Sequence, residues 1–266
     1  ESLFIQFVSA PEMKEVAKLV SKRLGRNLEP FDIWYDGFKT RSVISQDDLD
    51  KIVQEKYSSV EIFQKEIKQI LLNLDFEKST AEFISSRIIV DDSRGAGHAW
   101  GAVMKDDYSR LRTRAGKDGM DYKGFNVAMH ELGHTVEQTI TLHDVPYYSI
   151  SGVPNTAFTE ALAFMFQKRD MLMLNQKQSG AEMEALDLAW SLYEIMGVSL
   201  VDMNLWKWLY NNPDASAENI KKTVIEIAKD IWNKYYAEIF GIKDQVILAI
   251  YSHMIDYPLY LSAYPL

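Results

Sequence analysis

The stretch Met129-His130-Glu131-Leu132-Gly133-His134 decides how the rest of the chain is interpreted. It has the pattern His-Glu-x-x-His, and the flanking residues predict that it lies inside a helix spanning about 125–142. Two imidazoles four residues apart on a helix stand on one face, one turn above the other. That spacing lets both bind a single tetrahedral zinc ion, while the intervening glutamate reaches a water at the open position. The alternative is a pair of histidines on a solvated helix face.

Composition limits the classes of partner. The chain has 266 residues, enough to bury a substantial core, and a net charge of −9, which argues against nucleic acid and anionic membranes as partners. No run of about 18 uncharged apolar residues occurs, so no segment is expected to span a membrane. The absence of cysteine excludes disulfides and thiolate metal ligands, and it is compatible with any redox compartment. The chain begins at Glu1 rather than methionine, so we expect a processed or trimmed N-terminus.

Helical patterns dominate the sequence on both sides of the motif. Before it, we predict helices from Glu12 to a stop at Gly25, from Ser45 onward, and through 60–74, all acting as scaffold. After it, an apolar helix is predicted to follow Pro154-Asn155 and to carry Glu160 in its first turns. The remaining predicted helices are 181–196, 199–211, 216–240 and 243–257, with breaks at Gly197, Pro213 and Gly241.

Short strands are predicted only between these two groups of helices, at 88–90, 98–104 and 109–114. Gly95 and Gly97 lie between the first two strands. They permit two interpretations. One is a hairpin turn, and the other is an edge strand whose backbone groups pair with an extended peptide.

A catalytic zinc usually has three protein ligands and one open position, so a third ligand is needed. The metzincin extension requires glycine at 137 and histidine at 140, where this chain has Glu137 and Ile140. His143 would lie about 13 Å further along a continuous helix, too far to reach the same metal. Glu160 remains, because a metal ion would compensate for burying its carboxylate. Its alternative role is a salt bridge to an arginine or lysine.

The chemistry of such a set is hydrolytic. With His130, His134 and Glu160 holding zinc, a polarised water would attack a carbonyl, and Glu131 would take its proton and pass it to the leaving amine. The developing oxyanion needs further donors, for which the segment 253–264 offers one histidine and three tyrosines. Taken alone, that segment also fits an aromatic-rich core helix.

These segments resemble the thimet oligopeptidase and oligopeptidase F family of zinc metallopeptidases. The resemblance rests on HELGH at 130–134, on Glu160 within FTEALAF, and on HMIDYPLYLSAY at 253–264. The residues RGAGH at 94–98 are similar to the family's glycine-alanine strand beside the cleft, and 24–35 is similar to the segment that opens its catalytic half.

The resemblance implies a mainly α-helical, zincin-like catalytic domain with a small β-sheet beside a deep channel, which cleaves short peptides with one zinc ion per chain. Its metal ligands would be His130, His134 and Glu160, with Glu131 as base and acid. His253 and a tyrosine, in the order of preference Tyr264, Tyr260 and Tyr257, would stabilise the intermediate. The backbone of the substrate would pair with Gly95, Ala96, Gly97 and His98.

We therefore predict a single catalytic domain, with a helical scaffold part at 1–90 and a zinc-site part at 91–266. Family members are usually longer, so we expect part of a family-type chain. Three alternatives stay open: a related zinc exopeptidase, a zinc-holding peptide-binding domain without activity, and a helical structural protein with a coincidental motif. The Gly-Met-Glu-Asn signature of many zinc aminopeptidases is missing, and the presence of Glu131 argues against a purely structural metal site. The sequence does not determine the oligomeric state.

Overall fold

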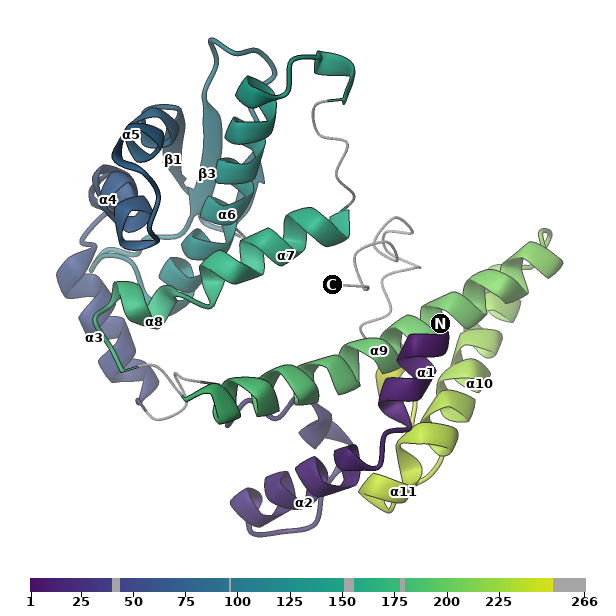
Figure 1. The fold of residues 1–266 in the computed structure, drawn as a ribbon. Helices are drawn as coiled ribbons and strands as arrows, with labels where there is room; N and C mark the ends of the chain where they lie inside the picture. Colours follow the sequence, from purple (N-terminus) through teal and green to yellow (C-terminus); the bar gives the residue numbers. More distant parts are fainter. Residues whose placement is uncertain (40–43, 96, 151–155, 178–179, 251–266) are drawn as a thin grey trace. The chain divides into compact units, whose positions relative to one another are not determined.

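A computed structural model describes residues 1–39, 44–95, 97–150, 156–177 and 180–250 (Figure 1). It is mainly helical with one small three-stranded sheet, which confirms the predicted secondary-structure class. The helices are α1 (Ser2–Val8), α2 (Glu12–Leu24), α3 (Gln46–Lys56), α4 (Val60–Asn73), α5 (Lys78–Ser86), α6 (Tyr122–Asp144), α7 (Thr156–Gln167), α8 (Asp170–Met173), α9 (Ala181–Asn211), α10 (Ala217–Tyr235) and α11 (Ala237–Phe240). The strands are β1 (Ile88–Asp92), β2 (His98–Trp100) and β3 (Ser109–Thr113). Within the described ranges, no helix combines the length and hydropathy that crossing a bilayer requires.

The chain divides into two compact units. One contains the described residues of Glu1–Ser42 and Ser179–Pro265, and the other contains those of Val43–Gln178. This division differs from the predicted parts at 1–90 and 91–266. The reason is packing: α3, α4 and α5 share one hydrophobic core with α6, so residues 44–90 belong to the same unit as the His-Glu-x-x-His motif.

The sheet of the second unit has the order β1-β3-β2. β1 pairs in parallel with β3, and β2 pairs antiparallel with β3, with His98 opposite Arg112. Because β1 and β2 are not neighbours, Gly95 and Gly97 do not form a hairpin turn between paired strands, and that interpretation is wrong. In Figure 1, α6 lies along β3, whereas α4 and α5 lie on the β1 side.

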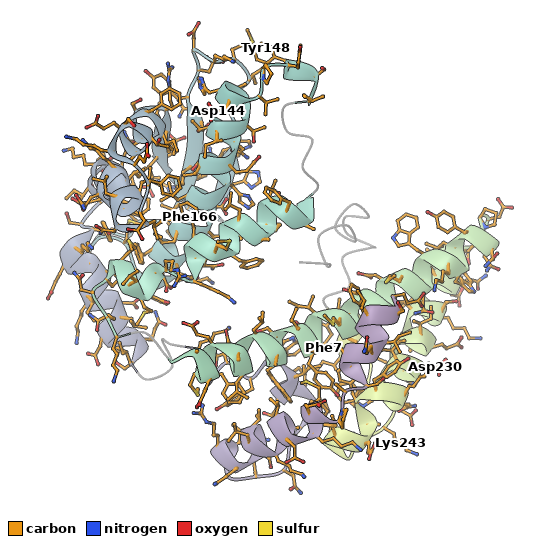
Figure 2. All side chains as sticks on the ribbon, in the orientation of Figure 1. Phe7, Asp144, Tyr148, Phe166, Asp230 and Lys243 are labelled. Atoms are coloured by element: carbon orange, nitrogen blue, oxygen red, sulfur yellow. The ribbon has the colours of Figure 1, made fainter. Side chains whose placement is uncertain are left out.

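The core of this unit surrounds α6. Phe125 stacks on Tyr57 of the α3 end at 5.2 Å between ring centroids, and Phe63 of α4 packs edge-on against both rings. Phe166, labelled in Figure 2, brings α7 into the same core. Burial of these aromatic and aliphatic side chains supplies the main stabilising free energy and fixes α6 between the sheet and α7.

The first unit is organised around α9, which runs without interruption through Gly197. The predicted break there is wrong. Gly197 is needed for close packing, because a Cβ at this position would lie 2.1 Å from the hydroxyl oxygen of Tyr236. That hydroxyl donates to the carbonyl oxygen of Tyr193 at 2.6 Å, which joins the end of α10 to α9. The predicted stop at Gly241 is present, with the left-handed φ of 70° that favours glycine, but no helix begins at 243.

We expect Gly197→Ala to lower the free energy of unfolding by about 1–3 kcal/mol, because the added methyl group overpacks the contact with Tyr236. Chemical denaturation followed by circular dichroism measures the change. Gly180→Ala, at the N-cap of the same helix with nothing within 4 Å of the added Cβ, is the control and should lower stability by less than about 1 kcal/mol, the usual preference of an N-cap for glycine over alanine. Equal effects of the two substitutions would contradict the packing account.

Candidate metal centre

The helix that carries the motif is fixed to the sheet at its first turn. Asp121 is the N-cap of α6, and its carboxylate accepts from the amide of Gly124 at 2.6 Å. The hydroxyl of Thr113, at the end of β3, donates to the carbonyl oxygen of Gly124 at 2.6 Å. A Cβ on Gly124 would lie 2.5 Å from the carbonyl oxygen of Arg114, so only glycine allows this approach. These contacts therefore fix the position of the first turn of α6 against the end of β3.

The second glycine of α6 sets the distance to α7. A Cβ on Gly133 would lie 2.6 Å from the Cα of Ala163, so the backbones of the two helices are in direct contact at this point. Ala163 is one turn beyond Glu160 on α7, and Gly133 lies between the two histidines of the motif. The close approach thus brings the Glu160 carboxylate within reach of both imidazoles.

The structure brings His130, His134 and Glu160 together. Nε2 of His130 lies 3.2 Å from Oε2 of Glu160, and Nε2 of His134 lies 3.4 Å from Oε1. One ligand atom from each residue lies within 4.8 Å of the others, and the group is the sole cluster of this kind among the described residues. The three side chains are 13–22% exposed, so the group is partly accessible to solvent.

The electrostatics of the group favour a negative carboxylate between two imidazoles. Burial by itself would raise the pKa of Glu160, but hydrogen bonds and charge from His130 and His134 outweigh it and lower the pKa to about 2. Burial would likewise lower the pKa of His130, yet the contact with Glu160 leaves that pKa raised. The alternative partner for Glu160 was an arginine or lysine, whereas its ion-pair partners among the described residues are the two histidines.

Glu131 lies beside this group and is 8% exposed. Burial raises the pKa of its carboxyl above the usual value, opposed by the charges of His130, His134 and His98. A carboxyl with a raised pKa is a better proton acceptor than an exposed one, which suits a general base.

Of the predicted substrate-binding residues, Gly97 and His98 lie near the candidate base, whereas Gly95 is not shown to contact it. A Cβ on Gly97 would lie 3.3 Å from Oε1 of Glu131, so the backbone at Gly97 lies against the candidate base. His98 begins β2, the strand at the edge of the sheet, and its charge acts on Glu131. A Cβ on Gly95 would contact nothing within 4 Å, and Ala96 lies outside the described residues.

The remaining predicted site residues can be placed only in part. His253, Tyr257, Tyr260 and Tyr264 lie outside the described residues. His143 is at the far end of α6, where its ring packs edge-on against Phe83, consistent with its exclusion as a ligand.

Sequence reasoning missed a set of polar residues behind His130. Nδ1 of His130 lies 3.1 Å from Oε1 of Gln167, which in turn contacts Asn126. A signal for them exists in the spacing: Asn126 lies one turn before His130 on α6, and Gln167 lies two turns after Glu160 on α7. Polar residues on the same faces as metal-ligand candidates are expected to orient them.

The chain matches no family model, and neither a curated protein nor a solved structure is detectably similar to it.

The pKa of Glu160 predicts how the stability of the metal-free protein depends on pH. Because folding lowers this pKa from 4.5 to about 2, the carboxylate stabilises the fold above pH 4.5, and this contribution is lost as the pH falls from 4.5 toward 2. Glu160→Gln should remove on the order of 2 kcal/mol of stability at pH 6 and make the acid side of the profile less steep.

Denaturant unfolding at a series of pH values measures this, with Glu55→Gln, an exposed acid on α3, as the control. Identical pH profiles for wild type and Glu160→Gln would show that the carboxylate does not interact with the histidines in solution.

Proposed function

We propose that this protein is a zinc-dependent peptidase that hydrolyses short peptides. The single observation that carries the proposal is the convergence of two imidazoles and one carboxylate from α6 and α7, with a second, buried carboxyl from Glu131 beside them. A structural metal site has no use for Glu131, whereas a hydrolytic site needs a proton acceptor at that position. The zincin-like relationship and the oligopeptidase family are part of the same proposal, supported by the motifs in the sequence.

The donor set fits zinc. Zinc bonds of about 2.0–2.2 Å in a tetrahedral arrangement separate neighbouring ligand atoms by roughly 3.3 Å. Oε2 of Glu160 lies 3.2 Å from Nε2 of His130, and Oε1 lies 3.4 Å from Nε2 of His134. One ligand atom from each of the three residues lies within 4.8 Å of the others, so small side-chain adjustments bring all three to zinc-bonding distance. Two imidazoles and a carboxylate are a ligand combination that zinc favours, and the partial exposure of the group leaves room for water and substrate.

The chain's own residues then supply the remaining chemistry. A bound zinc ion would polarise the attacking water and the scissile carbonyl. Glu131 accepts the proton of the water as it attacks and delivers it to the nitrogen of the leaving amine. Burial raises the pKa of the Glu131 carboxyl, which makes its carboxylate a stronger proton acceptor.

The strand β2 supports a peptide as the substrate. It is an edge strand, and in the described sheet it pairs with β3 alone. Its start at His98 lies beside Glu131, so an extended peptide added to this edge would pass close to the candidate base. Backbone pairing of this kind requires an unfolded segment, which favours short peptides over folded proteins as substrates.

We expect the purified protein to bind about one zinc ion per chain, because three ligands converge at one site. His130→Ala or Glu160→Gln should weaken zinc binding by at least tenfold, whereas His143→Ala, a histidine on the same helix outside the site, should not. Elemental analysis and competition with a chromogenic chelator measure stoichiometry and affinity. Zinc binding that survives loss of Glu160 unchanged would remove Glu160 from the ligand set.

Glu131→Gln should retain zinc and lower the rate of peptide hydrolysis by about 10²–10⁴-fold, because the amide cannot accept a proton. A fluorogenic peptide blocked at both ends serves as substrate. Asp144→Asn, an acid-to-amide change at the exposed end of α6, is the control (Figure 2). Full activity of Glu131→Gln would refute the assigned role, and cleavage only of peptides with a free end would indicate an exopeptidase instead.

A further inference from the structure

A chain of hydrogen bonds leads from His130 to a buried carboxylate. Oε1 of Gln167 lies 3.1 Å from Nδ1 of His130, and Nε2 of Gln167 donates to Oδ1 of Asn126 at 2.7 Å. Nδ2 of Asn126 donates to Oδ2 of Asp170 at 2.6 Å. Asp170 is 5% exposed and is the first residue of α8. These hydrogen bonds therefore connect the ring of a candidate metal ligand to the carboxylate of Asp170 through two intervening side chains.

The direction of this chain follows from the chemistry of its last member. A carboxylate only accepts hydrogen bonds, so Asn126 must turn its NH₂ group toward Asp170 and its oxygen toward Gln167. Gln167 must then donate with its NH₂ group and turn its oxygen toward His130. An oxygen facing Nδ1 requires a proton on Nδ1, and a neutral imidazole with Nδ1–H carries its lone pair on Nε2.

We propose that Asp170 sets the tautomer of His130 through Asn126 and Gln167, so that the Nε2 lone pair is available to the metal. Asp170 is thus a positioning residue, not a ligand. This inference rests on the proposed function, because the tautomer matters only if His130 binds a metal. The tautomer itself is set by the protein's own hydrogen bonds, whether or not a metal is bound.

Two further donors hold Asp170 in place. The hydroxyl of Tyr122 donates to Oδ2 at 2.5 Å, and the amide of Met171 donates to Oδ1 at 2.5 Å. Tyr122, Asn126 and His130 follow one another at single-turn spacing along α6, so one face of the helix carries both the anchor and the ligand. The backbone donor at Met171 has a consequence for variants, because whatever atom occupies the Oδ1 position must accept a hydrogen bond.

Asp170→Asn should reverse the donor and acceptor roles along these hydrogen bonds. The carbonyl oxygen of the new amide is required opposite the Met171 amide, so its NH₂ group takes the Oδ2 position and donates to Asn126. Asn126 and Gln167 then turn over, an NH₂ group faces Nδ1 of His130, and the proton moves to Nε2. We expect zinc affinity, measured by chelator competition, to fall 10–100-fold.

The double variant Gln167→Glu with Asp170→Asn should restore it. The carboxylate at 167 accepts from both Nδ1 of His130 and the NH₂ group of Asn126, and the oxygen of Asn126 accepts from the amide at 170. Every donor between residue 170 and His130 again has an acceptor, with Nδ1–H on His130. The Tyr122 hydroxyl loses its acceptor at Oδ2 in both the single and the double variant, so that loss does not distinguish them. A residue that only maintains packing would not be rescued by a second substitution at a different position. Zinc affinity of the double variant near wild type supports the proposal, and an affinity as low as that of Asp170→Asn overturns it.

A direct measurement of the tautomer separates this proposal from the proposed function. Nitrogen-15 NMR of the imidazoles is recorded on metal-free Glu160→Ala protein at alkaline pH, where no carboxylate competes for Nε2. His130 should be the Nδ1–H tautomer there and become Nε2–H when Asp170→Asn is added, with His143 as the internal reference. An unchanged tautomer overturns the proposal even if the protein binds zinc, and the predicted change supports it even if the protein hydrolyses nothing.

Should Asp170→Asn fail to fold, Gln167→Leu breaks the chain at its contact with His130. It should lower zinc affinity by a similar factor, whereas Met165→Leu, an exposed position on the same helix, should not. Wild-type affinity in Gln167→Leu would overturn the proposal.

Discussion

The contact between Gly133 and Ala163 is the constraint on which the candidate site depends. At this point α6 and α7 touch backbone to backbone, and a single methyl group on residue 133 would have to occupy space 2.6 Å from the Cα of Ala163. Interhelical distances are otherwise set by larger side chains. Because residue 133 has no side chain, α7 comes close enough to α6 for the carboxylate of Glu160 to contact two imidazoles of that helix. The glycine of the motif is therefore as necessary to the geometry as its histidines.

Buried and half-buried polar groups lie on two sides of this contact. On one side, Glu131 faces the backbone at Gly97 and the strand edge of β2. On the other, His130 is connected through Gln167 and Asn126 to Asp170. Burying so many polar atoms is costly unless each has a partner, and the pairing leaves little freedom for the orientation of any one of them. The same network that satisfies these groups also aims the nitrogen and oxygen atoms at a common point.

The sequence predicted most of the local features and one non-local contact, and it missed the other non-local contacts. The motif helix, the helix carrying Glu160 and the proximity expected between them follow from periodicity and from the cost of an unpaired carboxylate, and the structure has both helices and that proximity. The predicted break at Gly197 is wrong because the prediction used only the low helix propensity of glycine. Packing against Tyr236 outweighs that propensity and keeps the helix continuous. The parallel pairing of β1 with β3 and the Gln167–Asn126–Asp170 chain join residues far apart in sequence, and no local pattern encodes such pairings. The roles assigned to His253 and the C-terminal tyrosines remain predictions from the family resemblance.

Three side chains from α6 and α7 are proposed to form one zinc site. A crystal structure of the zinc-soaked protein, with anomalous data collected on both sides of the zinc absorption edge, is the sharpest test. We expect one strong anomalous peak per chain, bonded to Nε2 of His130, Nε2 of His134 and a carboxylate oxygen of Glu160 at about 2.0–2.2 Å. A peak elsewhere, or an ordered triad with zinc in excess and no peak, would contradict it.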